Sequence, residues 1–270
     1  MGIIKTSPLF LAKYVQCFYS VIENDSSHTV HRRLPDGTLD LVFNLSDAVS
    51  LSRDGEQFNP MPAASLTGLY PDRSFICYAN KVHLVGVVFQ PGTAHLFIND
   101  SLEHIKASTI DAADIFGKDI YMLPERLAAL PDEVAKHYFL EKLLMKFVAH
   151  RKQEYHFNNI LHAVKGIHAA EGNLDIGGLH DTHLMSERNF RRKFVDFVGM
   201  SPKQYAGIIR IKSFSKRYKA SRLNCNNILY DLGYNDQAHF NKDFRKIVGA
   251  SPGVYFNEMN SLAENFIDLI

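Results

Sequence analysis

The sequence predicts an α+β protein, in which a small β-barrel or jelly-roll with helices is followed by an all-α domain with two helix-turn-helix units. Three observations support this prediction. A helical segment recurs in the C-terminal half at a distance of fifty residues. Short strand-like segments separated by turn residues fill about residues 12–91, and positive charge is concentrated in the half that carries the repeat.

The N-terminal half has the pattern of several short strands. After the turn residues Pro35-Asp36-Gly37, every second residue over 39–45 is a large apolar one, and Asp40, Val42 and Asn44 lie between them. This period of two predicts a half-buried strand. Asp54-Gly55 predicts a hairpin, and Ala79-Asn80-Lys81 predicts a second hairpin between two apolar segments. The series of strands over 12–91 therefore predicts a small barrel or a jelly-roll sandwich.

From residue 93 to residue 150 the pattern becomes helical, so residues 1–150 are predicted to form one domain. Pro131-Asp132 begins a helix with an apolar stripe that packs either on the barrel or against a second subunit. The stripe consists of Val134, Tyr138, Leu140, Leu143, Leu144, Phe147 and Val148. Polar residues 151–158 are predicted to be a linker, with a second domain over 159–257 and a tail over 258–270.

The repeated segment defines the second domain, since Ser186–Tyr205 returns as Asp236–Tyr255. Apolar residues at i, i+4 and i+8 predict a helix of about three turns with one buried stripe. A glycine follows each helix, and Ser-Pro opens the next one. Ser186 and Asp236 stand at the expected N-caps. The shared residues are Phe190, Phe194, Val198, Gly199, Ser201, Pro202 and Tyr205, matched by Phe240, Phe244, Val248, Gly249, Ser251, Pro252 and Tyr255.

The side of each repeated helix opposite its apolar stripe is polar. These outward residues are Arg188, Asn189, Arg191 and Arg192 on the first helix, and Gln237, His239, Asn241 and Lys242 on the second. Arginine and lysine suit guanine edges and phosphates, and asparagine and glutamine suit adenine. A charged face alone is more often an ordinary solvated surface. The duplication and the caps favour a surface that reads DNA.

The net charge of +1 hides an uneven distribution. Residues 1–150 contain 13 Lys+Arg and 17 Asp+Glu, whereas residues 151–270 contain 17 Lys+Arg and 12 Asp+Glu. The basic half is therefore the one with the repeated helices. Phosphate neutralisation supplies much of the affinity of a DNA-binding protein, so this distribution agrees with a DNA-binding domain.

Four motifs over about residues 158–256 together resemble the DNA-binding domain of the AraC/XylS family of bacterial transcription regulators. They are MSERNFRRKF, GMSPKQYAGIIRIK, ILYDLGYNDQAHFNKDF and VGASPGVY. The resemblance implies two helix-turn-helix units joined by a long helix that carries Arg210. His180, Leu184 and Leu229 depart from the family's usual small residues. Segments before residue 100 are similar to a sensor-type domain described in the family as a truncated jelly roll.

The resemblance implies a transcription regulator, with activation favoured, and double-stranded DNA as its partner. RNA polymerase, a small-molecule effector and a second copy in a homodimer are further partners to test. The long segment 202–218 is predicted to be a rigid connecting helix, on which Lys216 is assigned to a phosphate contact. Recognition helices about 34 Å apart would then read two elements about 10 base pairs apart.

Enzymatic and metal-binding alternatives have less support in the sequence. A DNA-repair alkyl transferase fused to the same DNA-binding domain needs clustered cysteines, and Cys17, Cys77 and Cys225 are isolated. The pairs His28/His31 and His180/His183 lack the pattern of a metal-binding jelly roll. We therefore predict no catalytic residue, no metal and no cofactor. A ligand-independent DNA-binding regulator and a helical protein-interaction module remain as other classes.

The predicted location is the cytoplasm, without a membrane partner. Pro8 and Lys13 interrupt the apolar residues near the N-terminus before a signal-like segment can form. No apolar run has the length that a bilayer-spanning helix needs. The isolated cysteines indicate reduced, structural residues.

Overall fold

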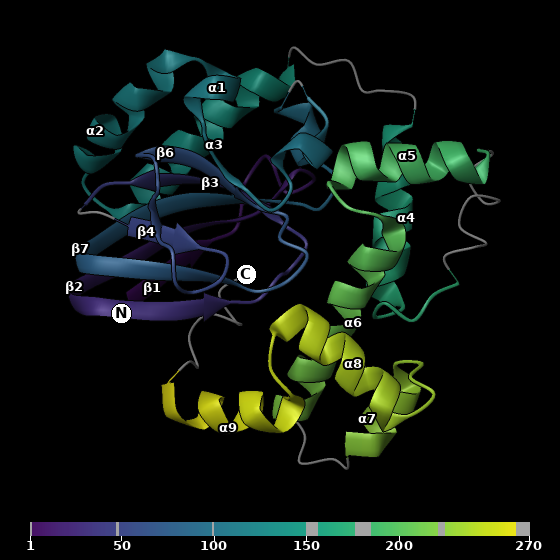
Figure 1. The fold of residues 1–270 in the computed structure, drawn as a ribbon. Helices are drawn as coiled ribbons and strands as arrows, with labels where there is room; N and C mark the ends of the chain where they lie inside the picture. The colour runs from purple at the N-terminus through teal and green to yellow at the C-terminus, as the bar shows by residue number, and fades with distance from the viewer. Residues whose placement is uncertain are drawn as a thin grey trace.

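A computed structural model describes residues 2–46, 49–98, 100–149, 156–175, 185–220 and 225–262. An antiparallel β-sheet with short helices and one long helix forms the N-terminal part, and a helical C-terminal part lies beside it (Figure 1). This arrangement confirms the predicted α+β class. Among the described helices, none combines the length and the apolar character that crossing a membrane requires.

The sheet extends beyond the predicted range 12–91. Its strands are β1 Gly2–Thr6, β2 Val15–Arg33, β3 Leu39–Asn44, β4 Val49–Ser52, β5 Asn59–Pro60, β6 Ala64–Gly68, β7 Ser74–Phe89 and β8 Thr109–Asp111. They follow the order β1-β2-β7-β3-β6-β8, with β4 paired to β5 and β7. All these pairings are antiparallel. The β4–β5 pair confirms the hairpin around Asp54-Gly55, whereas closure into a barrel or jelly roll stays a prediction.

The second predicted hairpin, at Ala79-Asn80-Lys81, is wrong because β7 runs continuously through these residues. Asn80 has a φ of 57°, and the register between β2 and β7 shifts on both sides of the Ser26–Asn80 pair. An irregularity in a long ladder accommodates a left-handed residue without reversing the chain, since extra residues increase the local bend and twist of a strand. The turn-like sequence therefore marks a distortion of β7 and not its end.

The strand predicted to be half-buried, β3, is buried on both faces. Leu41 and Phe43 belong to one hydrophobic cluster, and Val42 belongs to another cluster on the opposite face. The polar residue of the alternation, Asp40, is only 2% exposed, and its carboxylate lies 3.8 Å from the Arg33 guanidinium. Burial, and secondly the charge of Asp36, raises the pKa of Asp40 to about 7. The prediction of a half-buried strand was wrong because it assumed that Asp40 faces solvent, whereas Asp40 is buried beside Arg33.

Short helices and one long helix follow the sheet, in broad agreement with the helical pattern of 93–150. They are the 3₁₀ helices η1 Ala94–Leu96, η2 Leu102–Ile105 and η3 Lys118–Met122, and the α-helices α1 Ala113–Phe116, α2 Leu123–Ala128 and α3 Glu133–Ala149. Strand β8 interrupts this region. Helix α3 begins directly after Pro131-Asp132, where the Asp132 carboxylate accepts a hydrogen bond of 2.8 Å from the backbone N–H of Ala135.

The predicted apolar stripe of α3 is only partly buried. Leu140 and Leu144 are buried, but Val134 and Tyr138 are 61% and 41% exposed. The buried face carries polar residues in their place: Lys136, His137 and Glu141. The Glu141 carboxylate accepts hydrogen bonds from the backbone N–H groups of Leu9, Phe10 and Leu11 at 3.1, 2.7 and 2.9 Å. These backbone donors, about 130 residues away in the chain, offset the cost of burying the Glu141 side chain.

His137 gives the contact between α3 and the sheet a pH dependence. Its ring nitrogens lie 3.0 Å from the Thr6 hydroxyl and 2.9 Å from the Ser20 hydroxyl. Glu133, Lys136 and His83 complete the polar surroundings. Burial lowers the pKa of His137 below its usual value near 6.5, against the opposing effect of Glu133. Because the unfolded state then binds more protons, stability is fully present above the unfolded pKa and falls as the pH drops below it.

We expect His137→Gln to flatten the acid side of the stability curve. The slope of unfolding free energy against pH below about pH 6.5 should decrease by at most about 1.4 kcal/mol per pH unit, the value for one proton. Urea denaturation at a series of pH values measures this slope. His162→Gln, at an exposed position of the helix over residues 157–169, is the matched control. Equal slopes for His137→Gln and the unaltered protein would contradict the expectation.

The C-terminal part consists of six helices within the described ranges. They are α4 Phe157–Ala169, α5 Glu187–Val198, α6 Pro202–Ala220, α7 Cys225–Asp231, α8 Gln237–Val248 and α9 Pro252–Leu262. Helix α4 begins inside the predicted linker, and residues 151–155 of that linker lie outside the described residues. The first repeat shares one hydrophobic cluster with the β domain, through Phe190, Phe194 and Phe197. The second repeat has a smaller cluster built around Phe214, Phe240 and Phe244.

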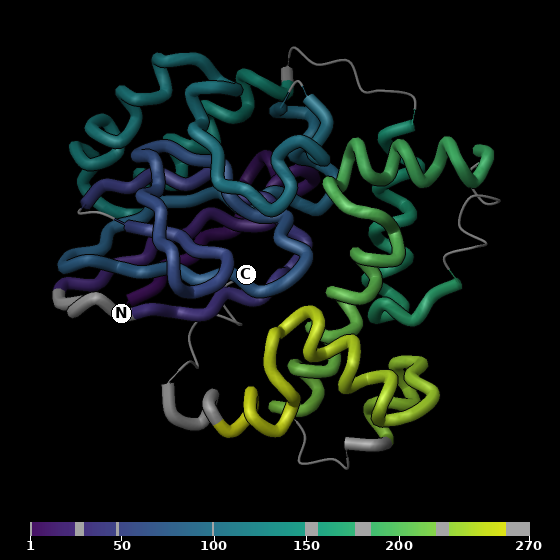
Figure 2. Tube along the Cα trace, viewed as in Figure 1, coloured from purple at the N-terminus to yellow at the C-terminus, as the bar shows by residue number. Residues whose placement is uncertain are grey.

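The segment between β6 and β7 contacts the same position in both repeats. A Cβ atom added to Gly199, at the end of α5, would lie 2.6 Å from the Leu69 side chain. A Cβ added to Gly249, at the end of α8, would meet the Arg73 guanidinium, and the backbone N–H of Arg73 donates a 2.9 Å hydrogen bond to the Ile247 carbonyl. Figure 2 shows the β domain beside these helix ends. Residues 69–73 thus link the β domain to both units.

Candidate nucleic-acid interface

The two repeated helices begin and end in the same way. The Ser186 side chain accepts a hydrogen bond from the backbone N–H of Asn189, and the Asp236 side chain accepts one from His239 at 2.7 Å. Each helix ends on a left-handed glycine with a φ of 79°, Gly199 and Gly249. These contacts satisfy backbone groups that a helix end leaves unpaired, and they confirm the predicted caps.

Buried phenylalanines fix the orientation of both helices. Phe190 and Phe194 are 1% and 0% exposed, and Phe240 and Phe244 are likewise 1% and 0% exposed. In the second unit the Phe214 ring of α6 lies 4.3 Å from the Phe240 ring, centroid to centroid. Because one face of each helix is held in a core, the opposite face must point away from it.

The outward face of α5 is basic. Arg188, Arg191 and Arg192 are exposed, and Asn189 is half-buried. The Asn189 side-chain oxygen accepts a 3.0 Å hydrogen bond from the Arg192 guanidinium, which positions that side chain one turn along the helix. Arg191 forms a 2.6 Å ion pair with Glu187. The face therefore presents guanidinium groups of which two are already oriented by neighbours.

The outward face of α8 is also basic and is wider than the sequence predicted. Gln237, His239 and Lys242 are exposed, and Asn241 is half-buried. A shallow, open hollow on this face is lined by Ala238, Asn241, Lys242, Arg245 and Lys246. The predicted outward residues did not include Arg245 and Lys246. These two residues follow Asn241 and Lys242 at the i+4 spacing, which places them on the same face one helical turn later and could have identified them.

Helix α6 joins the two units and is held at several points. Its 19 residues correspond to about 28 Å at 1.5 Å per residue. The Arg210 guanidinium donates a 2.8 Å hydrogen bond to the Gly172 carbonyl after α4 and lies over the Tyr234 ring of the second unit. Arg217 forms ion pairs with Glu171 and Asp231. These contacts give the predicted connecting helix a fixed relation to both units.

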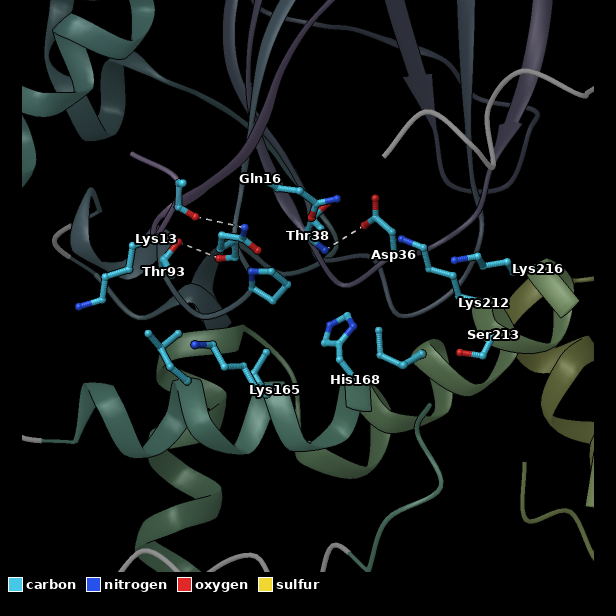
Figure 3. Close-up of a pocket in the computed structure, with 16 residues that line it drawn as sticks. Lys13, Gln16, Asp36, Thr38, Thr93, Lys165, His168, Lys212, Ser213 and Lys216 are labelled. Atoms are coloured by element: carbon cyan, nitrogen blue, oxygen red, sulfur yellow. Dashed lines mark hydrogen bonds between the residues drawn. The ribbon is translucent and has the colours of Figure 1, made fainter. Parts of the chain in front are cut away.

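Lys216 lies apart from the other predicted DNA contacts. Its side chain is exposed on α6 and lines a pocket between the C-terminal helices and the β domain, close to Lys212 (Figure 3). The other eight predicted residues lie on α5 and α8. His180, His183 and Leu184 lie outside the described residues, and Leu229 is buried on α7. Within the described ranges, no group of three or more His, Cys, Asp or Glu residues could hold a metal ion.

Two families match separate parts of the chain. Residues 182–258 match the family described as helix-turn-helix domain, and residues 7–111 match a domain of unknown function. Over 122 residues the chain is 27% identical to an uncharacterized HTH-type transcriptional regulator from Haemophilus influenzae. This match covers 45% of the chain and 40% of that relative, so the chain spans less than half of the relative's length.

Solved structures to which the chain is similar include ToxT from Vibrio cholerae. One ToxT structure has 11% sequence identity and a TM-score of 0.47, with 89% of this chain and 98% of ToxT covered. Another, of wild-type ToxT bound to an unsaturated fatty acid, has 12% identity and a TM-score of 0.46, with 92% and 98% covered.

The fold and the paired, capped helices define a protein with a double helix-turn-helix domain behind an antiparallel β domain. The helix-turn-helix domain over residues 182–258 is of the AraC type.

Proposed function

We propose that the protein is a sequence-specific DNA-binding transcription regulator in which α5 and α8 each enter a major groove. The observation that carries this proposal is the pair of helices from a duplicated sequence. Each buries a phenylalanine stripe and presents exposed basic and amide side chains on its other face. Helix α6 keeps the two reading helices apart, so they face successive grooves about 34 Å, or about 10 base pairs, apart on one side of the duplex.

The outward residues divide into two kinds of contact under this proposal. Arg188, Arg192, Gln237 and Lys242 reach base edges or the adjacent phosphates. Arg191, Asn189, His239 and Asn241 flank them, and Arg245 and Lys246 extend the basic face of α8. The phosphate contact of Lys216 stays a prediction, and the position of its side chain in the interdomain pocket makes a separate test necessary.

Selection of bound sequences from a random DNA library by the full-length protein tests the proposal. We expect two short conserved blocks about 10 base pairs apart, and affinity for the selected site that falls steeply with salt, because bound cations are released from each neutralised phosphate. The triple variant Lys242→Ala, Arg245→Ala and Lys246→Ala should lose most of this affinity. Lys118→Ala, at an exposed position of η3 in the other domain, is the control. Failure of the folded protein to enrich any sequence would refute the proposal.

We further infer that the N-terminal domain regulates the DNA-binding domain. Residues 69–73 contact the ends of both reading helices, and the first unit shares its hydrophobic core with the β domain. A small molecule bound to the N-terminal domain has a direct route to both units through these contacts. The exposed Val134 and Tyr138 of α3 provide an apolar surface for a homodimer, and RNA polymerase is the partner that activation requires. A regulator that needs no ligand is the alternative.

The cysteines give little support to an alkyl transferase, which needs a reactive thiolate. Burial, and secondly the charge of Asp40, raises the pKa of Cys17 to about 11, so this thiol is protonated at neutral pH. Cys17 and Cys77 are both free thiols. Each lies in a strand of the sheet, at a distance along the chain from the reading helices.

A further inference from the structure

A pocket of about 590 Å³ lies between the β domain and the helices α4 and α6. One wall comes from the start of β2, the turn before β3 and the end of β7. The facing wall comes from α4 and α6. Figure 3 shows side chains from both walls lining the space, with Lys13 and Lys165 towards one end and Asp36, Lys212 and Lys216 towards the other. This volume is in the range of small-molecule sites and is far too small for a DNA duplex.

Lysine side chains dominate the charge of this pocket. Lys13 contributes from the β domain, Lys165 from α4, and Lys212 and Lys216 from α6. Asp36 is the one carboxylate among the lining residues, and one of its oxygens already accepts a 2.9 Å hydrogen bond from the Thr38 backbone. Among the described residues, Lys13, Lys165 and Lys216 form no ion pair. The pocket thus holds a positive excess that its own carboxylate does not neutralise.

The remaining polar lining points to a hydrophilic ligand. Gln16, Gln90, Thr38 and Ser213 supply amide and hydroxyl groups on both walls. His168 on α4 lies within the same space, and desolvation, followed by the positive charge of Lys212, lowers its pKa. A neutral imidazole adds hydrogen-bonding capacity without reducing the positive charge of the four ammonium groups. Lysine ammonium groups bind phosphate and carboxylate oxygens through charge-assisted hydrogen bonds.

We propose that this interdomain pocket binds a small polyanion, a molecule with two or more phosphate or carboxylate groups. A single carboxylate would leave most of the positive excess uncompensated. A ligand with separated anionic groups can contact Lys13 on one wall and Lys165 or Lys216 on the other at the same time. Such a ligand ties the β domain to α6, the helix that sets the separation of α5 and α8. This last consequence, regulation of DNA reading, rests on the proposed function, whereas the binding itself does not.

Calorimetric titration of the full-length protein with pyrophosphate and with citrate tests the site, with acetate at matched ionic strength as a monovalent control. We expect saturable binding of one molecule per chain for at least one of the two polyanions, and none for acetate. Pyrophosphate alone would assign the site to phosphorylated ligands, and citrate alone to multiply carboxylated ones. Absence of saturable binding by both polyanions would overturn the proposal.

Two variants test the position of the site. Lys13→Gln in the β domain and Lys165→Gln in α4 should each weaken polyanion binding by about tenfold or more, the usual effect of removing a charge-assisted hydrogen bond. Lys118→Gln should leave it unchanged. Thermal unfolding without ligand checks that the variants are folded. Unchanged affinity in both folded variants would overturn the proposal.

A second measurement examines the link between the domains. Hydrogen exchange of α4 and α6 should slow when the polyanion is bound, because its anionic groups hold these helices to the β domain. DNA binding is measured separately, with the selected site and without polyanion. A negative titration together with normal DNA binding would refute the polyanion site and leave the proposed function intact. A positive titration together with absent DNA binding would support the polyanion site and refute the proposed function.

Discussion

Phe244→Ala should destabilise the second helix-turn-helix unit by about 3 to 5 kcal/mol, the usual cost of truncating a fully buried phenylalanine. The Phe244 ring is 0% exposed and lies within 5.4 to 6.3 Å of the rings of Phe240, Tyr255, Phe256 and Phe214, centroid to centroid. The cluster around it is small and contains no residue of the sheet. The cavity left by Phe244→Ala could close only if α6 moved, and α6 also packs against the first unit. We therefore expect little relaxation around the cavity.

The equivalent Phe194→Ala substitution should have a wider effect. Phe194 belongs to the large cluster that the first unit shares with the β domain, so its loss should weaken the domain contact as well as the unit itself. Hydrogen exchange separates the two cases. Phe244→Ala should accelerate exchange in α7, α8 and α9, whereas Phe194→Ala should accelerate it in α5 and in the segments of the β domain that touch α5.

Tyr230→Ala is the matched control for this experiment. Tyr230 is an aromatic residue of α7 in the same unit, but it is 66% exposed. Its truncation should change the unfolding free energy by no more than about 0.5 kcal/mol. Urea unfolding measured in the same buffer compares the three variants. A cost well below 1 kcal/mol for Phe244→Ala would contradict the buried assignment.

The features that the sequence predicted correctly depend on neighbours within one or two helical turns. The Ser186 and Asp236 caps, the left-handed Gly199 and Gly249, and the phenylalanine stripes all follow from residues at short spacing. Such local signals determine where a helix begins, where it ends and which face it buries. They also placed eight of the candidate DNA contacts on the outward faces of α5 and α8.

The features that the sequence did not predict depend on partners far along the chain. Asp40 and His137 look like surface residues until Arg33 and the Thr6 and Ser20 hydroxyls are placed beside them. Asn80 looks like a turn residue because asparagine is favoured at left-handed positions both in a hairpin turn and in a distorted strand. No local pattern marks such pairings.

The interdomain pocket is a further case of this limit. Lys13, Lys165 and Lys212 are scattered through the sequence among other lysines, and only the packing of α4 and α6 against the β domain gathers them. For the same reason the sequence predicted a DNA contact for Lys216 and did not indicate that this residue lines the interdomain pocket. The contacts of residues 69–73 with the ends of α5 and α8 also join distant segments, and no repeat or spacing in the sequence predicted them.

Arg192→Ala and Gln237→Ala should alter different parts of the DNA site. Arg192 lies on α5 and Gln237 on α8, so each substitution should relax the preference at one or two base pairs within its own block. If Arg192 forms a bidentate contact with guanine, its loss should cost about 1 to 3 kcal/mol of binding free energy. Because Asn189 holds the Arg192 guanidinium, Asn189→Ala should produce a smaller change at the same base pairs.

Binding profiles over a library of mutated sites measure these effects, and a lysine pair supplies the comparison for backbone contacts. Lys246→Ala on α8 should weaken all sequences alike and reduce the salt slope by about one, the signature of a lost phosphate contact. Lys216→Ala should do the same if its side chain reaches the DNA backbone from α6, and should leave the slope unchanged if it serves only the interdomain pocket. Changes at the same base pairs for Arg192→Ala and Gln237→Ala, or at none in folded variants, would refute reading by two separate helices. The distance between the two altered blocks then measures the separation that α6 imposes, which we expect to be about one turn of the duplex.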